Sequence, residues 1–256
     1  MLIFTVGDVV SDSGIRLLEK TLRPFKKLKG IHFTIVNAEN ASGMGLVPEQ
    51  ADRIYNAGAD LITLGNHAFS RREMLSYVED QPYILRPENY THYNPGKGHG
   101  VYVAENGQQL AVICLIGRVF MQNQAENPFF IADRVIQKLD AKIKCVEIHG
   151  EATSEKSALA WYLDGRVSVV YGTHTHVQTA DERILPKGTG YISDIGMTGP
   201  VDSVLGMDPE TSVERLLGVP QIKYKPASGA CMLQGALFEV DDNTGRCLSV
   251  ERIRLS

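Results

Sequence analysis

The sequence predicts a layered α/β fold, and three observations lead to that prediction. Short apolar runs typical of strands recur along the chain, and segments of mixed charge with helical spacing separate most of them. Polar side chains follow several of these apolar runs directly. The 256 residues are 43% hydrophobic, which is enough to build the core of one large domain. Because no internal repeat or linker-like stretch interrupts the sequence, we expect a single domain over residues 1–256.

The expected strands and helices alternate along most of the chain. The predicted strands are Leu2–Val6, His32–Val36, Leu61–Leu64, Leu110–Leu115, Lys144–Ile148 and Val167–Tyr171. The predicted helices are Ile15–Leu28, Pro48–Ala57, Arg71–Glu79, Ile131–Lys142 and Ser154–Leu163, with Thr153 or Ser154 as the N-cap of the last. Near the C-terminus, two strand-like runs flank "DDNTG" (241–245), which predicts a hairpin that closes the domain with antiparallel strands.

Residues 197–227 depart from the alternating pattern. The segment is rich in glycine and proline, and it contains a short helix candidate at Pro209–Leu217. Such a composition is typical of loops. The sequence fits a lid over a site and a plain excursion equally well.

The charge and the cysteines exclude several classes of protein. The chain carries 26 Lys+Arg and 30 Asp+Glu, a net charge of −4, and its longest basic stretch is "KKLK" at 26–29. We therefore expect no nonspecific binding of nucleic acid, which needs clustered cations. The cysteines form no CxxC pair and are expected as reduced, buried thiols; they are Cys114, Cys145, Cys231 and Cys247. The N-terminal region shows neither a signal peptide nor a membrane span, so we expect a cytoplasmic location.

Polar residues that can bind metals or transfer protons stand behind five of the predicted strands. Ligands of open α/β sheets bind beyond the carboxyl ends of the strands, because loops can converge there without unpairing the sheet. A single Asp or Asn at a strand end is more often a cap or a turn residue. The same coincidence at five strands predicts a shared site. The eight residues are Asp8, Glu39, Asn40, Asn66, His67, His149, His174 and His176.

The two histidines of "GTHTHV" (172–177) are spaced by two residues. In an extended chain this spacing places both side chains on one side, because strand residues alternate with a period of two. The sequence therefore predicts that His174 and His176 enter one metal site behind Val167–Tyr171. Taken alone, the pair is equally compatible with two solvated loop histidines.

The chemistry of the group indicates transition metals. Carboxylate, amide oxygen and imidazole suit iron, manganese or zinc, and the group contains no cysteine. Seven candidate ligands exceed the needs of one ion, whereas two ions that share a carboxylate use all of them. Two divalent cations and two carboxylates leave a net charge of about +2, which attracts a phosphate and supplies hydroxide from a bound water.

Several short motifs resemble the calcineurin-like metallophosphoesterase family. The order of "GD" (7–8), "GNH" (65–67), a lone strand-end His149 and "GTHTH" (172–176) is similar to the family pattern. The chain departs from that pattern at Val10, where the family's D-x-H motif has histidine, and at "NAEN" (37–40), which replaces the second aspartate block. These departures resemble the YmdB-like bacterial branch, as do "HGEATSEK" (149–156), "GTHTHVQTAD" (172–181) and "DIGMTGP" (194–200), and the resemblance extends over essentially the whole chain. That branch commonly has alanine where Gly150 stands.

The resemblance implies a layered α/β/β/α sandwich with mixed sheets and a dinuclear site at the carboxyl ends of the strands. Glu39 would bridge two divalent ions. The resemblance favours iron or manganese, with zinc as an alternative. One ion would be held by Asp8, Glu39, Asn40 and His176, and the other by Glu39, Asn66, His149 and His174. His67 would act as general acid and protonate the leaving oxygen while a metal-bound hydroxide attacks phosphorus. The alternative for His67 is a residue that orients a metal ligand.

The resemblance also implies a phosphodiesterase with a small phosphate ester as substrate, foremost a 2′,3′-cyclic nucleotide, and a homo-oligomeric assembly. Two alternatives stay open: a phosphomonoesterase, and a regulatory metalloprotein that binds a nucleotide or an RNA end with little turnover. An amidohydrolase barrel also uses an HxH pair, but there the pair belongs on the first strand.

Five further side chains have expected positions. Arg86 and Arg118 could bind phosphate or form buried ion pairs, and the sequence favours neither. Glu155 and Lys156 are expected on the surface, and Trp161 in the core.

Overall fold

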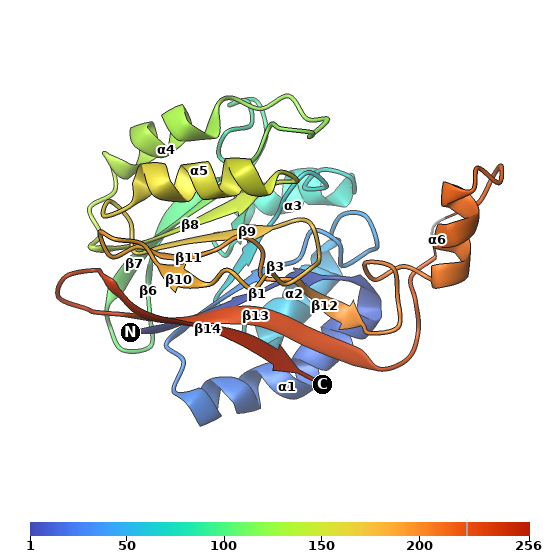
Figure 1. Ribbon diagram of the computed structural model, residues 1–256, viewed down its shortest axis with the longest axis horizontal. Helices are drawn as coiled ribbons and strands as arrows, with labels where there is room; N and C mark the ends of the chain where they lie inside the picture. Colours follow the sequence, from blue (N-terminus) through green and yellow to red (C-terminus); the bar gives the residue numbers. More distant parts are fainter. Residues whose placement is uncertain (224) are drawn as a thin grey trace.

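A computed structural model of the protein describes residues 1–223 and 225–256. Among these residues, two β-sheets are stacked face to face, and helices cover the outer face of each (Figure 1). Helices α1 (Ser11–Lys29) and α2 (Pro48–Ala57) cover one sheet, and α4 (Pro128–Ile136) and α5 (Thr153–Leu163) cover the other. The α/β/β/α sandwich expected from the sequence is thereby confirmed.

The first sheet has the N-terminal strand near its centre. Its strands are β1 (Leu2–Val6), β2 (Asp8–Val9), β3 (Phe33–Asn37), β4 (Leu61–Thr63), β5 (Ile84–Leu85), β12 (Met197–Pro200), β13 (Cys231–Val240) and β14 (Cys247–Leu255). They follow the order β2-β12-β13-β1-β3-β4-β5, and β14 pairs with β13. The pairs β1/β3 and β3/β4 are parallel, whereas β13 is antiparallel to β1. The C-terminal hairpin predicted around "DDNTG" is the β13/β14 pair.

The second sheet is parallel at its centre. Its strands are β6 (His99–Val103), β7 (Gln109–Ile116), β8 (Ile143–His149), β9 (Val169–Thr173), β10 (Arg183–Ile184) and β11 (Gly190–Ile192). The order is β10-β11-β9-β8-β7-β6, with parallel pairing from β7 to β11 and antiparallel strands at both edges. Because parallel strands end at the same edge of a sheet, the loops that follow β3, β4, β8 and β9 can meet.

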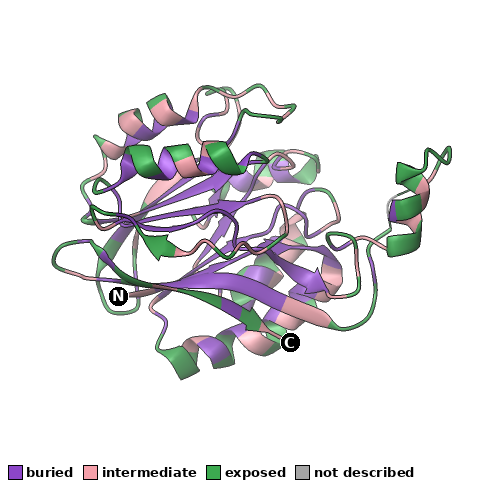
Figure 2. Ribbon diagram, viewed as in Figure 1, coloured by how far each residue is buried: buried purple, intermediate pink, exposed green. Residues whose placement is uncertain are grey.

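Apolar side chains fill three layers, one between the two sheets and one under each pair of helices. Figure 2 shows that the strands of both sheets are largely buried. Neighbours along a strand enter different layers: Ile35 faces the second sheet, whereas Val36 packs toward α1. In β8, Cys145 and Val146 divide in the same way between the inter-sheet layer and the layer under α5. Strands buried on both faces need an apolar residue at nearly every position, which is why they stand out in the sequence as continuous apolar runs.

Two expectations about α5 are wrong. The N-cap residue is Ala152, which makes no side-chain capping bond, so neither Thr153 nor Ser154 caps the helix. Trp161 is 49% exposed rather than in the core, because the buried face of α5 is formed by other residues: Lys156, Leu159, Ala160 and Leu163. The Trp161 ring instead lies under the guanidinium of Arg183, 5.4 Å from its centroid.

The segment predicted as an excursion begins later than expected. Residues Met197–Pro200 form β12, which pairs with β2 and β13 inside the first sheet. The remainder, residues 201–227, is called the arm below; its residue 224 lies outside the described part. The arm carries α6 (Pro209–Leu216), which stands away from the two sheets in Figure 1. A lid-like movement of the arm stays a prediction.

The described residues contain no helix long and apolar enough to cross a membrane. Within the same residues all the cysteines are free thiols. Cys114, Cys145 and Cys247 are buried as predicted, whereas Cys231 is partly exposed.

Candidate metal centre

The eight polar residues singled out in the sequence meet at one edge of the sandwich. Asp8 opens β2, Glu39 and Asn40 follow β3, and the loop after β4 supplies the Asn66–His67 pair. From the second sheet, β8 ends at His149, and two further histidines follow β9. The two sheets thus contribute facing halves of a single group. That these residues meet is observed; which of them bind a metal stays a prediction.

The imidazole of His149 is the centre of the first cluster. Its Nε2 lies 2.9 Å from Glu39 Oε1, 2.9 Å from Asn66 Oδ1 and 3.0 Å from His174 Nδ1. One ring nitrogen can donate at most one hydrogen bond, so it cannot satisfy three such neighbours. Ligand atoms of Glu39, His149 and His174 all lie within 4.8 Å of one another. A set of converging lone pairs fits a cation in their midst.

The other ring nitrogen of His149, Nδ1, contacts a threonine hydroxyl outside the cluster. Its Nδ1 lies 2.9 Å from Thr173 Oγ1, and that hydroxyl donates to Glu147 Oε1 at 2.9 Å. Because the Thr173 proton goes to Glu147, the hydroxyl oxygen accepts from His149 Nδ1–H. In the neutral imidazole the lone pair is then on Nε2, the atom that faces Glu39. Glu147 is itself fully buried and also accepts from Tyr171 Oη at 2.9 Å.

Asp8, Asn40 and His176 form the second cluster, which adjoins the first. His176 Nδ1 donates to the carbonyl oxygen of Leu205 at 2.9 Å, and its Nε2 lies 3.1 Å from Asn40 Nδ2 and 3.6 Å from Asp8 Oδ1. Asp8 is 0% exposed, and its Oδ1 has no hydrogen-bond partner among the described residues. A buried carboxylate oxygen without a donor fits a cation, whereas Asn40 fits only after its amide is flipped to present oxygen.

The protonation states of the two carboxylates and of His174 suit cation binding. Burial alone would raise the pKa of Asp8, but the nearby charge of His176 and the backbone hydrogen bond from His174 outweigh it and hold that pKa below the usual value of a carboxyl. Burial also opposes ionisation of Glu39, whose pKa is nevertheless lowered by the charge of His149. Burial, together with repulsion from His149, lowers the pKa of His174 to about 4. At neutral pH the carboxylates are therefore charged and His174 is neutral, the forms in which these groups bind metals. Against the effect of burial, Glu39 raises the pKa of His149 and Asp8 raises the pKa of His176 to about 9. A cation must therefore displace a proton from His176 and compete with one at His149.

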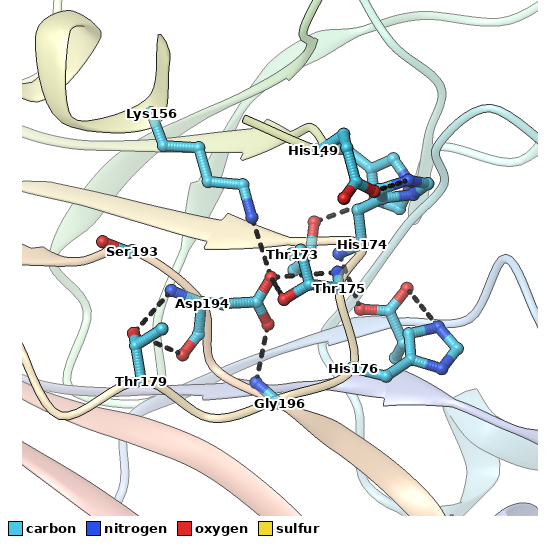
Figure 3. A network of polar contacts seen from close by, with 12 residues as sticks. His149, Lys156, Thr173, His174, Thr175, His176, Thr179, Ser193, Asp194 and Gly196 are labelled. Carbon is cyan, nitrogen blue, oxygen red and sulfur yellow. Dashed lines mark hydrogen bonds and ion pairs between the residues drawn. The ribbon is translucent and has the colours of Figure 1, made fainter. Parts of the chain in front are cut away.

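The two histidines of "GTHTHV" reach the site for a different reason than the one predicted. Strand β9 ends at Thr173, and His174 and His176 have left-handed backbone angles, φ 98° and 62°. The chain is therefore not extended here, and the alternation argument is wrong. A turn directs the rings instead, one to each cluster (Figure 3).

Glycine at position 65 gives the first cluster its room. A Cβ atom on Gly65 would lie 2.4 Å from Glu39 Oε2 and 2.4 Å from His149 Nε2. Gly150, directly behind His149, is different: a Cβ there would lie 3.5 Å from Gly117 Cα, an ordinary contact.

A cleft of about 750 Å³ opens above both clusters. Glu39, Asn40, His174 and His176 belong to its lining, as does His67. The backbone N–H of His67 donates to Glu39 Oε2 at 3.0 Å, which fixes the start of this loop against the cluster. The opposite wall comes largely from the arm; its members are Val204, Leu205, Met207, Ser212, Arg215, Leu216 and Pro226.

Neither of the arginines suggested by the sequence, Arg86 and Arg118, lines the cleft. Arg86 is 6% exposed and donates to the carbonyl oxygen of Pro87, so it is the buried structural residue of the two alternatives. Among the described residues the cleft is lined by Arg71 and Arg215, and not by Arg118. Arg71 Nη2 donates to the Ser42 carbonyl at 2.9 Å. Its place in "GNHAFSRR", close behind His67, is the signal that could have identified it.

Lys156 is buried, contrary to the expectation of a surface position. It is 1% exposed, and its Nζ lies 2.8 Å from Asp194 Oδ2. Asp194 was not among the predicted site residues, although it opens the "DIGMTGP" motif. Glu155 remains partly exposed, and its carboxylate accepts from the backbone of Arg118.

Comparison with known proteins agrees with this arrangement. The chain belongs to the family of YmdB-like proteins, whose family model matches residues 4–253. It is 44% identical over 259 aligned residues to the 2′,3′-cyclic-nucleotide 2′-phosphodiesterase of Bacillus subtilis (strain 168), an alignment that covers 100% of this chain and 97% of that protein. The resemblance inferred from the motifs is confirmed.

Solved structures share the fold over the full length. A hypothetical protein from Thermus thermophilus superposes with a TM-score of 0.93 at 37% identity, covering 100% of this chain and 99% of the other. A crystal structure described as a novel phosphatase from Mycoplasma pneumoniae gives a TM-score of 0.93 at 34% identity, covering 100% and 93%.

The contrast between Gly65 and Gly150 yields a prediction. Gly65→Ala pushes Glu39 and His149 apart and should abolish metal uptake, because the added Cβ overlaps both ligand atoms. Gly150→Ala should keep metal uptake and stabilise the protein by about 0.4–1 kcal/mol through a stiffer unfolded chain. Metal content after reconstitution and urea unfolding of both variants provide the check. Full metal content in Gly65→Ala would contradict the packing described here.

Proposed function

We propose that this protein is a metal-dependent phosphodiesterase that hydrolyses 2′,3′-cyclic nucleotides. The observation that carries the proposal is that Glu39 and His174, two members of the buried Glu39–His149–His174 cluster, line the large cleft. The printed name of the Bacillus subtilis relative supports the substrate class. That name specifies cleavage at the 2′ position. In such a reaction water adds to phosphorus, the bond to the 2′ oxygen breaks, and a nucleoside 3′-phosphate is left.

Two cations would be held by residues of the two clusters. Asp8, Asn40 and His176 would bind one, and Asn66, His149 and His174 the other. Glu39 would bridge them, because it contacts members of both clusters: Oε1 lies 2.9 Å from His149 Nε2 and 3.3 Å from Asn40 Nδ2. When bound, divalent iron or manganese, or zinc, would neutralise phosphate charge and lower the pKa of a coordinated water.

The cleft has the chemistry that a nucleotide needs. Its floor is polar and carries the two clusters, while its arm-side wall is largely apolar and includes Val204, Leu205 and Met207. A nucleobase presents two apolar faces, so it would pack against this wall while the phosphate lies at the floor. Arg71 stands in the same lining and would add positive charge near the ester.

His67 is proposed as the general acid. Its backbone is fixed through the bond to Glu39, and its side chain lines the cleft, with Nδ1 3.4 Å from Ser70 Oγ. A ribose oxygen is a poor leaving group and needs a proton as the P–O bond breaks. An imidazole beside, rather than inside, the ligand clusters can deliver it.

Two expectations from the sequence stay predictions alongside this function. They are the cytoplasmic location and the assembly into a homo-oligomer.

The substrate class can be tested directly. We expect a higher kcat/KM for 2′,3′-cyclic AMP than for 3′-AMP, because a strained cyclic diester needs less barrier lowering once water is positioned. The product should be 3′-AMP and not 2′-AMP, as read by chromatography. A clear preference for monoesters would reassign the protein to the phosphatases, and tight nucleotide binding without turnover would favour the regulatory alternative.

Replacement of single ligands separates the two metal sites. Glu39→Ala should lower metal content at both sites, since both ions share this carboxylate, whereas His149→Ala should empty chiefly one. Elemental analysis of reconstituted protein measures the content of each variant. Retention of two metals and of activity in Glu39→Ala would show that Glu39 does not bridge.

The role assigned to His67 predicts a dependence on the leaving group. His67→Gln should retain the metals and lose about 10²–10⁴-fold in kcat on 2′,3′-cyclic AMP. The loss should shrink for an aryl phosphodiester, whose leaving oxygen hardly needs a proton. The exposed His92 provides a control, and His92→Gln should match the wild type. Equal losses on both substrates would rule out general acid catalysis by His67.

A further inference from the structure

A buried ion pair lies beneath the turn that carries His174 and His176. Lys156, from α5, and Asp194, from the loop between β11 and β12, join at 2.8 Å between Nζ and Oδ2 (Figure 3). Their side chains are 2% and 1% exposed. A pair so deeply buried contributes little net stability compared with apolar residues of the same volume. Its role therefore lies in the contacts that it makes.

Those contacts converge on the residue between the two histidines. Asp194 Oδ2 accepts from the backbone N–H of Thr175 at 3.1 Å and from its Oγ1 at 2.8 Å. The other oxygen, Oδ1, accepts from Gly196 N–H at 2.9 Å. Each carboxylate oxygen therefore has an N–H donor of its own. Thr175 is therefore held by two hydrogen bonds to the buried Asp194 carboxylate, which is itself paired with Lys156.

The turn needs such an anchor. His174 and His176, on either side of Thr175, have φ angles of 98° and 62°, a region that non-glycine residues avoid. Residues in this region persist only where their surroundings hold them there. The backbone N–H of His174 adds one further bond, to Asp8 Oδ2 at 3.2 Å.

Lys156 makes the anchor possible. A carboxylate buried with neutral donors alone is costly, and the ammonium group balances its charge. Strand β9 leaves space for the lysine stem: a Cβ on Gly172 would lie 2.7 Å from Lys156 Cδ and 1.8 Å from the Ser193 carbonyl oxygen. The lysine ends the "HGEATSEK" motif and the aspartate opens "DIGMTGP", and the proposed reaction assigns neither residue a role.

We propose that Asp194 and Lys156 are positioning residues that, through Thr175, aim the His174 and His176 imidazoles at the two metal positions. The inference rests on the proposed function to the extent that it takes these histidines as metal ligands. One ion pair then controls both sites at once, in contrast to His149, which serves one. A pair that merely stabilises the fold would not change the two metal affinities selectively.

Calorimetric measurement of Mn²⁺ binding to chelator-treated protein tests this proposal. Thermal unfolding of the metal-free form shows whether each variant folds. Asp194→Asn should weaken both dissociation constants about 10–100-fold. An amide has a single acceptor oxygen, whereas both ends of Asp194 face N–H donors. Asp164→Asn is the matched control, because Asp164 is also buried, at 5% exposed, and accepts from two backbone N–H groups, those of Lys187 and Thr189, at the opposite end of β9. The control should bind Mn²⁺ like the wild type.

Two further comparisons separate aiming from charge and from folding. The double variant Lys156→Met/Asp194→Asn removes both charges and should still bind weakly; recovery of wild-type affinity would mean that an unpaired lysine charge caused the loss and would overturn the proposal. Thr175→Val keeps the ion pair and loses only the hydroxyl bond, so both dissociation constants should rise about 2–10-fold. Thr175→Ser keeps a hydroxyl and should restore them. If Asp194→Asn fails to fold, the comparison of Thr175→Val with Thr175→Ser tests the proposal in its place.

Unchanged dissociation constants in Asp194→Asn or Thr175→Val, or weakening of one site alone, would overturn the proposal. Wild-type protein that takes up no Mn²⁺ would overturn it as well. Wild-type protein that binds two Mn²⁺ ions but does not hydrolyse 2′,3′-cyclic AMP would refute the proposed function and leave the positioning role standing.

Discussion

Two buried carboxylates at the ends of neighbouring strands impose the constraint around which this site is arranged. Asp8 is 0% exposed and Glu39 is 1% exposed, and burial of a charge costs several kcal/mol unless it is compensated. Backbone N–H groups of His67 and His174 and the rings of His149 and His176 surround the two groups. One oxygen of Asp8 still lacks a donor among the described residues. Cations held at the two clusters would balance these negative charges.

Each imidazole is fixed by a contact on its far side. His149 Nδ1 is held by Thr173 and, through it, by Glu147; His176 Nδ1 is held by the Leu205 carbonyl; His174 Nε2 lies 3.2 Å from Glu151. The turn that joins the latter two rings rests on Asp194. Such outer contacts keep the ring directions set by the fold, so the three imidazoles would not need to turn when an ion binds.

The contact between His176 and Leu205 links the cleft wall to the metal centre. Leu205 belongs to the arm, whose side chains form the apolar face opposite the clusters, and its carbonyl oxygen orients His176. A substrate that contacts this wall would therefore act on the same segment that orients His176. Val10 stands where the wider family has a histidine, and it lines this cleft as an apolar side chain. The departure from the D-x-H motif thus exchanges a ligand for a wall residue.

The sequence by itself determined the fold class and the eight residues that meet at the strand ends. Strands buried on both faces must be apolar throughout, and the polar residues that follow parallel strands must converge, so local pattern carries this information. Only the tertiary structure decided which groups pair across the fold: Asp194 with Lys156, Glu147 with Thr173, and Arg71 with the cleft. His174 and His176 lie at the shared site as expected, but strand alternation is not the reason, because the φ angles of this turn depend on contacts with distant segments. Periodicity along a chain records which face is buried, whereas a contact between elements distant in sequence exists only once packing has brought their side chains together.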